Sequence, residues 1–362
     1  MIKKQDLWSH LAATDKKIVM YGMGNGADKI LSVCAKRGIE ISDFFASDGF
    51  VRGHTFHGKR VLSYSEAKQK YGADSMIVLL SFASSLPDVL ANIYKIADEC
   101  ELYAPDVPVC GANIFDADFH AKNADKINAV RQLLADEESV RVFDSVICYK
   151  LTGDVKCLRE VHSNFGDVLC DVVNAKSFQA IADLGAYNGD TLREIAPIAT
   201  NLQRAIAFEP DRRNFKKLTE YAASESRFCI EAHNIAAWDK CDTLFFDGGG
   251  NRNSTLIGGD AIAVGKAQKV VEVKANSLDN VAGDSHIDYI KYDVEGAEKE
   301  AIMGSLNTIE RCLPTLCVSL YHRSGDIFEL PLMIWEKFPQ YKFYMRRREY
   351  IPAWDTVLIA KL

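Results

Sequence analysis

The chain has 362 residues, more than one hydrophobic core usually requires, so we expect two domains joined by a connector. Hydrophobic residues make up 48% and charged residues 26% of the sequence, which excludes the classes of disordered and fibrous proteins. The net charge of −7 argues against a protein that coats nucleic acid, because such proteins carry a basic surface.

The sequence shows no signal for export or membrane insertion. The first residues are polar, and the most apolar run, residues 76–86, is too short to cross a bilayer. The ten cysteines include no Cys-x-x-Cys pair, and the closely spaced His54 and His57 have no third ligand nearby. We therefore expect a cytoplasmic protein without a membrane span, a disulfide framework or a structural metal site.

The first 112 residues alternate between strand and helix signals. Strands are predicted at 17–21, 41–46 and 75–82, and helices at 27–37, 65–70 and 86–100. We interpret residues 1–112 as a small Rossmann-like α/β domain. The glycine turn at 22–26 resembles that of nucleotide-sugar-binding half-domains, and a plain strand-to-helix turn explains it equally well.

The remaining chain divides into a helical and a second α/β segment. Residues 113–175 carry amphipathic helix patterns with little strand signal, which predicts a helical connector. Within residues 176–362, a parallel sheet that ends in an antiparallel hairpin is typical of Rossmann-like class I methyltransferases. We therefore predict that fold for this segment, with strands at 180–184, 205–209, 287–293, 316–322, 341–345 and 356–360.

The strand at 180–184 runs into a glycine turn that opens a helix. Glycine allows a ligand to approach the backbone closely, and the free amides at a helix N-terminus bind carboxylates. S-adenosylmethionine has a carboxylate for these amides and an ammonium group for Asp183 to balance. The predicted cofactor-binding residues of this turn are Asp183, Gly185, Ala186, Tyr187, Gly189, Asp190 and Thr191.

The next two strands also end in candidate cofactor-binding residues. Glu209 and Pro210 end the second strand, where a carboxylate can accept hydrogen bonds from both ribose hydroxyls. Asn234, Ala236 and Ala237 follow the third strand and leave room for an adenine ring. The spacing of Glu209 from the glycine turn indicates a nucleoside, and it fits NAD as well as S-adenosylmethionine.

Acidic and aromatic residues end the fourth and fifth strands, which face the same crevice in an open parallel sheet. We predict that Asp293 contacts the cofactor and that Glu295, Tyr321 and His322 bind the acceptor. Asp293 and His322 are the two candidate catalytic bases, and a structural role for His322 is equally compatible with the sequence. Asp293 and Glu295 also leave open whether the protein depends on a metal ion.

Together these segments resemble the FkbM family of methyltransferases. The matching stretches lie in the last half of the chain, at 183–186, 189–191, 208–211, 277–279, 293–298 and 321–322. The resemblance implies methyl transfer from S-adenosylmethionine to a hydroxyl group, often of a sugar or polyketide, with S-adenosylhomocysteine as the product. It implies a small-molecule or glycan acceptor, the net charge argues against a nucleic acid partner, and the sequence is compatible with a homo-oligomer.

Two other functions are compatible with the sequence. An NAD-linked oxidoreductase would use the glycine turn at 22–26, but it lacks a recognisable catalytic partner. A non-catalytic nucleotide- or sugar-binding module would have lost its activity, although the acids Asp183, Glu209 and Asp293 are all present.

Two further runs have more than one interpretation. The three arginines at 346–348 predict either recognition of an acidic group or an exposed strand edge. The glycine-rich run 248–255 predicts either a cover over the acceptor or a plain hairpin connection.

Overall fold

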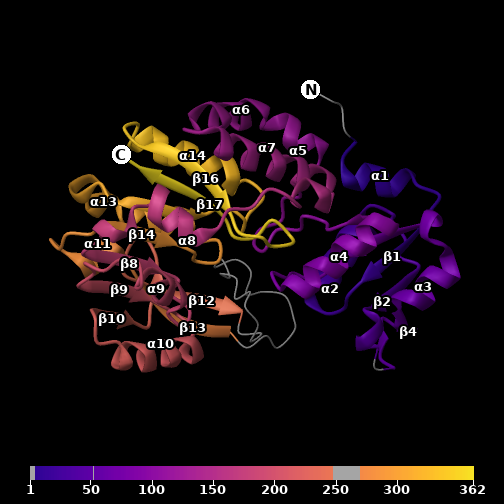
Figure 1. The fold of residues 1–362 in the computed structure, drawn as a ribbon, viewed down its shortest axis with the longest axis horizontal. Coiled ribbons are helices and arrows are strands. Elements are labelled where there is room, and N and C mark those ends of the chain that lie inside the picture. The colour runs from indigo at the N-terminus through magenta and orange to yellow at the C-terminus, as the bar shows by residue number, and fades with distance from the viewer. Residues whose placement is uncertain (1–4, 52, 248–269) are drawn as a thin grey trace.

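The computed structural model describes residues 5–51, 53–247 and 270–362, and the glycine-rich run 248–255 lies outside these ranges. Two sheets occupy opposite sides of the view, and helices from the middle of the chain lie along its upper edge (Figure 1). Among the described helices, none has both the length and the apolar composition needed to cross a bilayer.

The first sheet has five parallel strands in the order β5-β2-β1-β6-β7. Its central strands are apolar and buried, as expected for a parallel sheet with helices on both faces. The strands are β1 (Lys17–Tyr21), β2 (Asp43–Ala46), β5 (Leu62–Ser63), β6 (Met76–Leu80) and β7 (Glu101–Tyr103). The helices are α1 (Leu7–Ala13), α2 (Asn25–Lys36), α3 (Tyr64–Tyr71) and α4 (Pro87–Glu99), and β3 (Thr55–Phe56) pairs with β4 (Lys59–Arg60).

The middle of the chain is helical. The main helices are α5 (Ala117–Lys122), α6 (Ala124–Leu133) and α7 (Glu137–Thr152). Helix α7 begins after Asp136, whose carboxylate accepts a hydrogen bond from the Ser139 N–H, and ends at Gly153 with a φ of 65°. The short helix α8 (Phe165–Asp167) and a π-helical turn (Val168–Val172) then lead to the second sheet.

The second sheet has seven strands in the order β10-β9-β8-β14-β15-β17-β16. The strands from β10 to β15 in this order are parallel, and β17 is antiparallel to both of its neighbours. This arrangement confirms the fold class predicted from the sequence. The strands are β8 (Ala180–Leu184), β9 (Arg204–Phe208), β10 (Cys229–His233), β14 (Tyr289–Tyr292), β15 (Thr315–Ser319), β16 (Lys342–Arg347) and β17 (Thr356–Lys361).

Helices cover both faces of this sheet because its strands are apolar on both faces. On β14, Tyr289 packs into one core and Ile290 into the other, as the alternation of a strand requires. Helices α9 (Asp190–Ile195) and α10 (Arg212–Ser224) cover the first of these faces. The second is covered by α11 (Leu278–Ala282), α12 (Glu298–Met303), α13 (Leu306–Cys312) and α14 (Asp326–Lys337). A small sheet of β11 (Ala236–Ala237), β13 (Val270–Asn276) and β12 (Asp242–Asp247) lies between β10 and α11 in the chain.

The structure overturns both interpretations of the arginines at 346 and 347. Helix α7 packs against β16, so this edge strand is not exposed. Arg347 is fully buried and donates hydrogen bonds to the carbonyl oxygens of Leu158, Val161 and Tyr350. Arg346 is also buried and lies 2.6 Å from a carboxylate oxygen of Asp136. Both side chains therefore hold the middle segment against the sheet.

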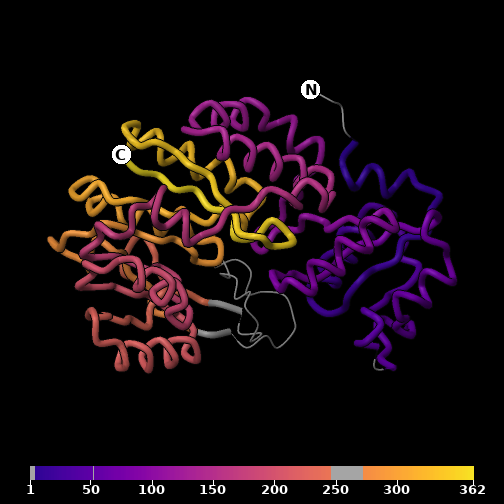
Figure 2. The backbone as a smooth tube through the Cα atoms, viewed as in Figure 1, coloured from indigo at the N-terminus to yellow at the C-terminus, as the bar shows by residue number. Residues whose placement is uncertain are grey.

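Among the described residues, backbone hydrogen bonds join residues 1–112 to the segments that follow strands of the second sheet at two places. The loop between β16 and β17 extends toward the first sheet (Figure 2). In this loop Ile351 exchanges backbone hydrogen bonds of 2.8 and 3.0 Å with Ser84, which follows β6. The second connection joins the Cys110 N–H to the His322 carbonyl oxygen at 2.9 Å.

Candidate active site

The candidate site lies at the carboxyl ends of the parallel strands of the second sheet. The chain runs outward from β8 through β9 to β10 and then crosses back to β14, so the strand order reverses between β8 and β14. Ligands of open α/β sheets bind in the crevice at such a reversal. The predicted site residues follow β8, β9, β10, β14 and β15, and their strands therefore end at this edge.

The turn after β8 requires glycine for steric reasons. Gly185 has a φ of 88°, and a Cβ atom there would lie 1.9 Å from the Asp293 carbonyl oxygen. The N–H groups of Gly185 and Ala186 both donate to the Phe208 carbonyl oxygen, at 3.0 and 2.9 Å. The turn is thus fixed to the ends of both β9 and β14.

The same turn leads directly into helix α9. Gly189, with a φ of 84°, immediately precedes the helix, and a Cβ atom there would lie 2.6 Å from the Tyr221 ring. Tyr187 also has a positive φ, of 48°. The Asp190 carboxylate accepts a hydrogen bond from the Thr191 N–H at 2.9 Å. The predicted residues of this turn therefore lie together at the start of α9.

Asp183 ends β8 as a buried carboxylate. Its side chain is 1% exposed, and neither of its oxygens accepts a hydrogen bond from a described residue. The nearest ammonium group is that of Lys291, 3.8 Å away. Burial raises the pKa of Asp183 to about 6. A buried acid that lacks donors is suited to a ligand that brings a positive charge.

Glu209 is a second buried acid, at the end of β9. One of its oxygens accepts a hydrogen bond of 2.7 Å from the Asp211 N–H, and burial raises its pKa to about 8. Asn234 supports the segment by donating to the carbonyl oxygens of Glu209 and Pro210 at 2.8 and 3.1 Å. The predicted small residues Ala236 and Ala237 are buried in β11.

Asp293 follows β14 and is surrounded by hydrogen-bond donors. Its Oδ1 accepts hydrogen bonds from the hydroxyls of Ser319 and Tyr321, at 2.9 and 2.8 Å, and its Oδ2 lies 3.2 Å from the Lys291 ammonium. Burial opposes its charge, but Lys291, His322 and the two hydroxyls outweigh burial and lower the pKa of Asp293 to about 2. Asp293 is therefore ionised across the physiological pH range.

His322 is buried among three carboxylates. Its Nδ1 lies 2.9 Å from Glu298 Oε1, although the approach is not that of an aligned hydrogen bond. Its Nε2 lies 3.7 Å from Asp293 Oδ1 and 3.6 Å from Glu295 Oε2. Burial disfavours the imidazolium, but Glu298, Asp293 and Glu295 outweigh it and raise the pKa of His322 to about 10.

A cavity of about 60 Å³ lies beside Asp293. Its polar lining includes Lys291, Asp293 and Ser319, and its apolar lining includes Phe165 and Leu169 of the segment before β8. Thr191, one of the predicted cofactor-binding residues, also lines it. The space next to the Asp293 carboxylate is thus open to a small group.

Three residues that support the site were absent from the predicted set. Lys291 is a charged residue within an apolar strand, a pattern that could have marked it as functional. Ser319 carries no such signal, because a single serine at a strand end is common. Glu298 lies in the first turn of α12, where an acid commonly stabilises the helix N-terminus. Its carboxylate also accepts hydrogen bonds from the N–H groups of Val294 and Gly296 and faces the His322 ring.

The segment before α5 packs directly on the site. The Cys110 thiol donates to the Glu295 carbonyl oxygen at 3.0 Å, and a Cβ atom on Gly296 would lie 2.8 Å from the Cys110 sulfur. Glu295 and Gly296 both have positive φ values, of 55° and 93°. Cys110 thus holds the turn that presents Glu295, a contact that no sequence pattern indicated.

The glycine turn of the first domain does not show the same arrangement. Asp48 follows β2, where a ribose-binding acid would lie in a dinucleotide fold. Its carboxylate accepts hydrogen bonds from the Ser65 N–H and hydroxyl at 3.0 and 2.7 Å. Gly26 packs so closely that a Cβ atom would lie 2.1 Å from the Ser81 carbonyl oxygen, which favours a packing role for this turn.

Comparison with known proteins bears on the second domain. Residues 183–352 match the family model described as the methyltransferase FkbM domain. The chain is similar to the crystal structure of methyltransferase FkbM from Methylobacillus flagellatus, with a TM-score of 0.71 and 20% identity over 95% of this chain and 90% of that one. At this level of identity, the similarity shows a shared fold. A comparison with curated proteins gave no match.

Two further solved structures match at TM-scores too low to support an argument. A methyltransferase from Geobacter sulfurreducens has a TM-score of 0.33 and 13% identity, over 70% of this chain and 98% of that one. Fibrillarin from Aeropyrum pernix, in complex with S-adenosyl-L-methionine, has a TM-score of 0.33 and 9% identity, over 52% of this chain and 68% of that one. The family match and the sheet topology together identify residues 183–352 as a methyltransferase FkbM domain.

Proposed function

We propose that this protein is an S-adenosylmethionine-dependent O-methyltransferase that acts on a hydroxyl group of a sugar-like or natural-product acceptor. The observation that carries the proposal is the pair of buried acids, Asp183 and Glu209, at the reversal point of an FkbM domain sheet. Burial raises the pKa of both, which is costly unless a ligand uses them.

The residues of this edge fit the cofactor. Asp183 would face the ammonium group of the cofactor, and the free amides at the start of α9 would bind the cofactor carboxylate. Glu209 would accept hydrogen bonds from the ribose hydroxyls. Asn234, Ala236 and Ala237 would border the adenine ring. When bound, S-adenosylmethionine supplies an electrophilic methyl group and leaves as S-adenosylhomocysteine. The Gly185 cradle, which a Cβ atom would fill, allows close approach to the backbone.

Asp293, Glu295, Tyr321 and His322 would face the acceptor. Methyl transfer requires an acceptor oxygen aligned with the methyl group and a group that takes its proton. Of the two proposed catalytic residues, Asp293 is ionised and can accept a hydrogen bond from the acceptor hydroxyl, but its pKa of about 2 makes it a weak base. His322 would orient the acceptor oxygen for as long as it keeps its own proton. The cavity beside Asp293 offers room for a small part of either ligand.

Calorimetric titration with S-adenosylhomocysteine tests the cofactor assignment. We expect one site per chain in the full-length protein, and Glu209→Ala should weaken binding by about 2–4 kcal/mol, because two charge-assisted hydrogen bonds are lost. Glu220→Ala is a suitable control, since Glu220 is an exposed residue of α10 and should leave the affinity unchanged.

The same titration separates the alternatives. Binding of NAD without binding of S-adenosylhomocysteine would refute the proposal. The acceptor class is tested by incubation with S-adenosylmethionine and a panel of hydroxylated sugars and natural products, with amines and thiols for comparison. A new methoxy signal by NMR is expected, and transfer to amines or thiols alone would contradict O-methylation.

A further inference from the structure

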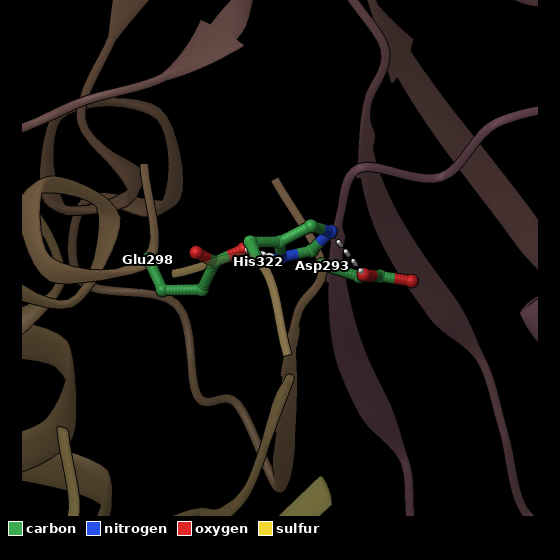
Figure 3. Close-up of side chains that lie close together, drawn as sticks. All are labelled: Asp293, Glu298 and His322. Atoms are coloured by element: carbon green, nitrogen blue, oxygen red, sulfur yellow. Dashed lines mark ion pairs between the residues drawn. The ribbon is translucent and has the colours of Figure 1, made fainter. Parts of the chain in front are cut away.

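His322 occupies a special place in the acceptor half of the site. Its ring lies between two carboxylates, with Glu298 on the Nδ1 side and Asp293 on the Nε2 side (Figure 3). Asp293, Glu298 and His322 each offer an atom of a type that binds metal ions, and these atoms lie within 4.8 Å of one another. Glu298 and Asp293 lie nearest to opposite nitrogens of the ring, at 2.9 Å from Nδ1 and 3.7 Å from Nε2.

Neither ring nitrogen makes an aligned hydrogen bond to a described residue, and Nε2 faces two carboxylates at longer distances than Nδ1 faces Glu298. The His322 side chain is 1% exposed, and its Nε2 makes no hydrogen bond to a described residue. This nitrogen points between Asp293 Oδ1 and Glu295 Oε2, at 3.7 and 3.6 Å. A buried ring nitrogen without a hydrogen bond indicates that something else binds there.

We propose that His322 Nε2, Asp293 Oδ1 and Glu295 Oε2 bind one divalent transition-metal cation of the Mn²⁺, Fe²⁺ or Zn²⁺ type. Ligand atoms about 2.1 Å from such an ion lie roughly 3.4 Å apart at a tetrahedral angle, close to the separations of both carboxylate oxygens from Nε2. An imidazole together with carboxylates favours these ions over Mg²⁺ or Ca²⁺, which prefer oxygen ligands alone.

Glu298 completes the arrangement from the other side of the ring. A metal-bound histidine usually has a carboxylate at its second nitrogen, which fixes the ring orientation and increases its basicity. Glu298 Oε1 lies 2.9 Å from Nδ1 and is itself held by the N–H groups of Val294 and Gly296 at 2.9 and 3.4 Å. Glu298 is therefore a positioning residue rather than a ligand.

The charges around the cluster are consistent with a cation. The carboxylates of Asp293, Glu295 and Glu298 face the ring, and the Lys291 ammonium lies on the far oxygen of Asp293, 3.2 Å away. The hydroxyls of Ser319 and Tyr321 already donate to Asp293 Oδ1 and would share this oxygen with the ion. A divalent ion would replace the proton at Nε2 and balance the negative charge that the Lys291 ammonium does not neutralise.

The position of the cluster indicates what the ion would do. The Glu295 side chain is 45% exposed and that of Asp293 26%, so one side of the cation would remain open to a ligand from solvent. Catalytic metal sites keep such an open position. An acceptor hydroxyl bound to the ion would lose its proton more readily. This role of the ion rests on the proposed methyl transfer, but the proposal that the ion binds does not.

Titration of the chelator-treated full-length protein with Mn²⁺, followed by EPR, tests the site without any need for activity. We expect one Mn²⁺ per chain, with a nitrogen coupling in the pulsed EPR spectrum that disappears in His322→Asn. Glu295→Gln should weaken binding by at least about tenfold. Glu336→Gln, at an exposed position of α14, should bind Mn²⁺ like the wild type.

The outcomes distinguish this inference from the proposed function. Absence of saturable Mn²⁺ binding up to about 1 mM would overturn it, as would wild-type affinity in Glu295→Gln. Glu295 is partly exposed, so this variant is informative even where His322→Asn fails to fold. S-adenosylhomocysteine binding measured in EDTA reports on the methyltransferase proposal separately, because Asp183 and Glu209, which carry that proposal, are not ligands of the ion.

Discussion

At the scale of single residues, the proposed cofactor half of the site depends on acids whose burial is unfavourable without a ligand. Burial raises the pKa of Glu209 to about 8, although backbone hydrogen bonds from Asp211, at 2.7 Å, and from Tyr187 favour its charged form. A carboxylate of this kind is ionised only when a ligand or a higher pH makes the charge favourable. Its protonation should therefore be linked to ribose binding.

We predict that S-adenosylhomocysteine binds more tightly as the pH rises from 7 to 8.5. If only the ionised form of Glu209 binds the ribose, the affinity should increase by about tenfold, because a pKa near 8 leaves most of the carboxyl protonated at pH 7. Calorimetry at several pH values measures this change. Glu209→Gln should show a smaller dependence on pH, and an equal dependence in both proteins would assign the titration to another group.

The same pKa has the opposite effect on the stability of the ligand-free protein. Because the folded pKa of about 8 lies above the ordinary value of 4.5, the folded state binds more protons than the unfolded state between these values. The contribution of Glu209 to the free energy of unfolding is therefore present at low pH and is lost as the pH rises through about 8. Ligand binding and stability thus respond to pH in opposite directions.

At the scale of elements, strand β16 depends on buried arginines rather than on apolar contacts alone. Arg347 is 0% exposed and donates to three backbone carbonyl oxygens of the segments around it. Burial lowers its pKa to about 10, so its charge is retained at neutral pH only because these acceptors replace water.

We predict that Arg347→Met lowers the free energy of unfolding by about 2–4 kcal/mol, since buried carbonyl oxygens lose their donors. Denaturant unfolding of the full chain measures this effect. Arg131→Met is the control, because Arg131 forms an exposed ion pair with Asp144 and should cost less than about 1 kcal/mol. Equal losses in the two variants would show that the Arg347 contacts contribute little.

The elements also show what the sequence could and could not reveal. The strands that end in the site and the glycine turn were predictable, because hydrophobic runs and turn glycines depend on the conformation of the local backbone. Asp293 and His322 follow the paired strands β14 and β15, and Asp293 Oδ1 lies 3.7 Å from His322 Nε2. The predicted crevice at the ends of these strands implied that the two residues lie close together. The burial of Arg347 and the contact of Cys110 with Glu295 were not predictable, because both depend on how distant segments pack.

At the scale of the whole molecule, one of the hydrophobic clusters extends from the first sheet through the intervening helices to one face of the second sheet. Val78 of β6, Phe143 of α7 and Phe343 of β16 belong to the same cluster of buried residues. The backbone connections at Ser84 and Cys110 add polar contacts between the first domain and the second sheet. The proposed acceptor half of the site is therefore built partly by residues that precede the FkbM domain.

This shared construction leads to a prediction about fragments. Every predicted cofactor-binding residue lies within residues 176–362, so a fragment of these residues contains all of them. The fragment lacks α7, which packs on β16, and it lacks the carbonyl oxygens of Leu158 and Val161, which accept hydrogen bonds from Arg347. Arg347 would therefore lose these acceptors, and the face of β16 that α7 covers would be exposed. We expect fragment 176–362 to show no cooperative unfolding transition and no S-adenosylhomocysteine binding.

A fragment of residues 105–362 provides the matched comparison. It keeps α7, the buried Lys150–Asp106 ion pair of 2.8 Å, and the Cys110 contacts with Glu295 and His322. It should therefore unfold cooperatively and bind S-adenosylhomocysteine with an affinity close to that of the full chain, as measured by calorimetry. Cooperative unfolding and full binding by 176–362 would show that the helical segment is dispensable. Loss of binding by a folded 105–362 fragment would instead mean that the first sheet is needed to hold the cofactor site in shape.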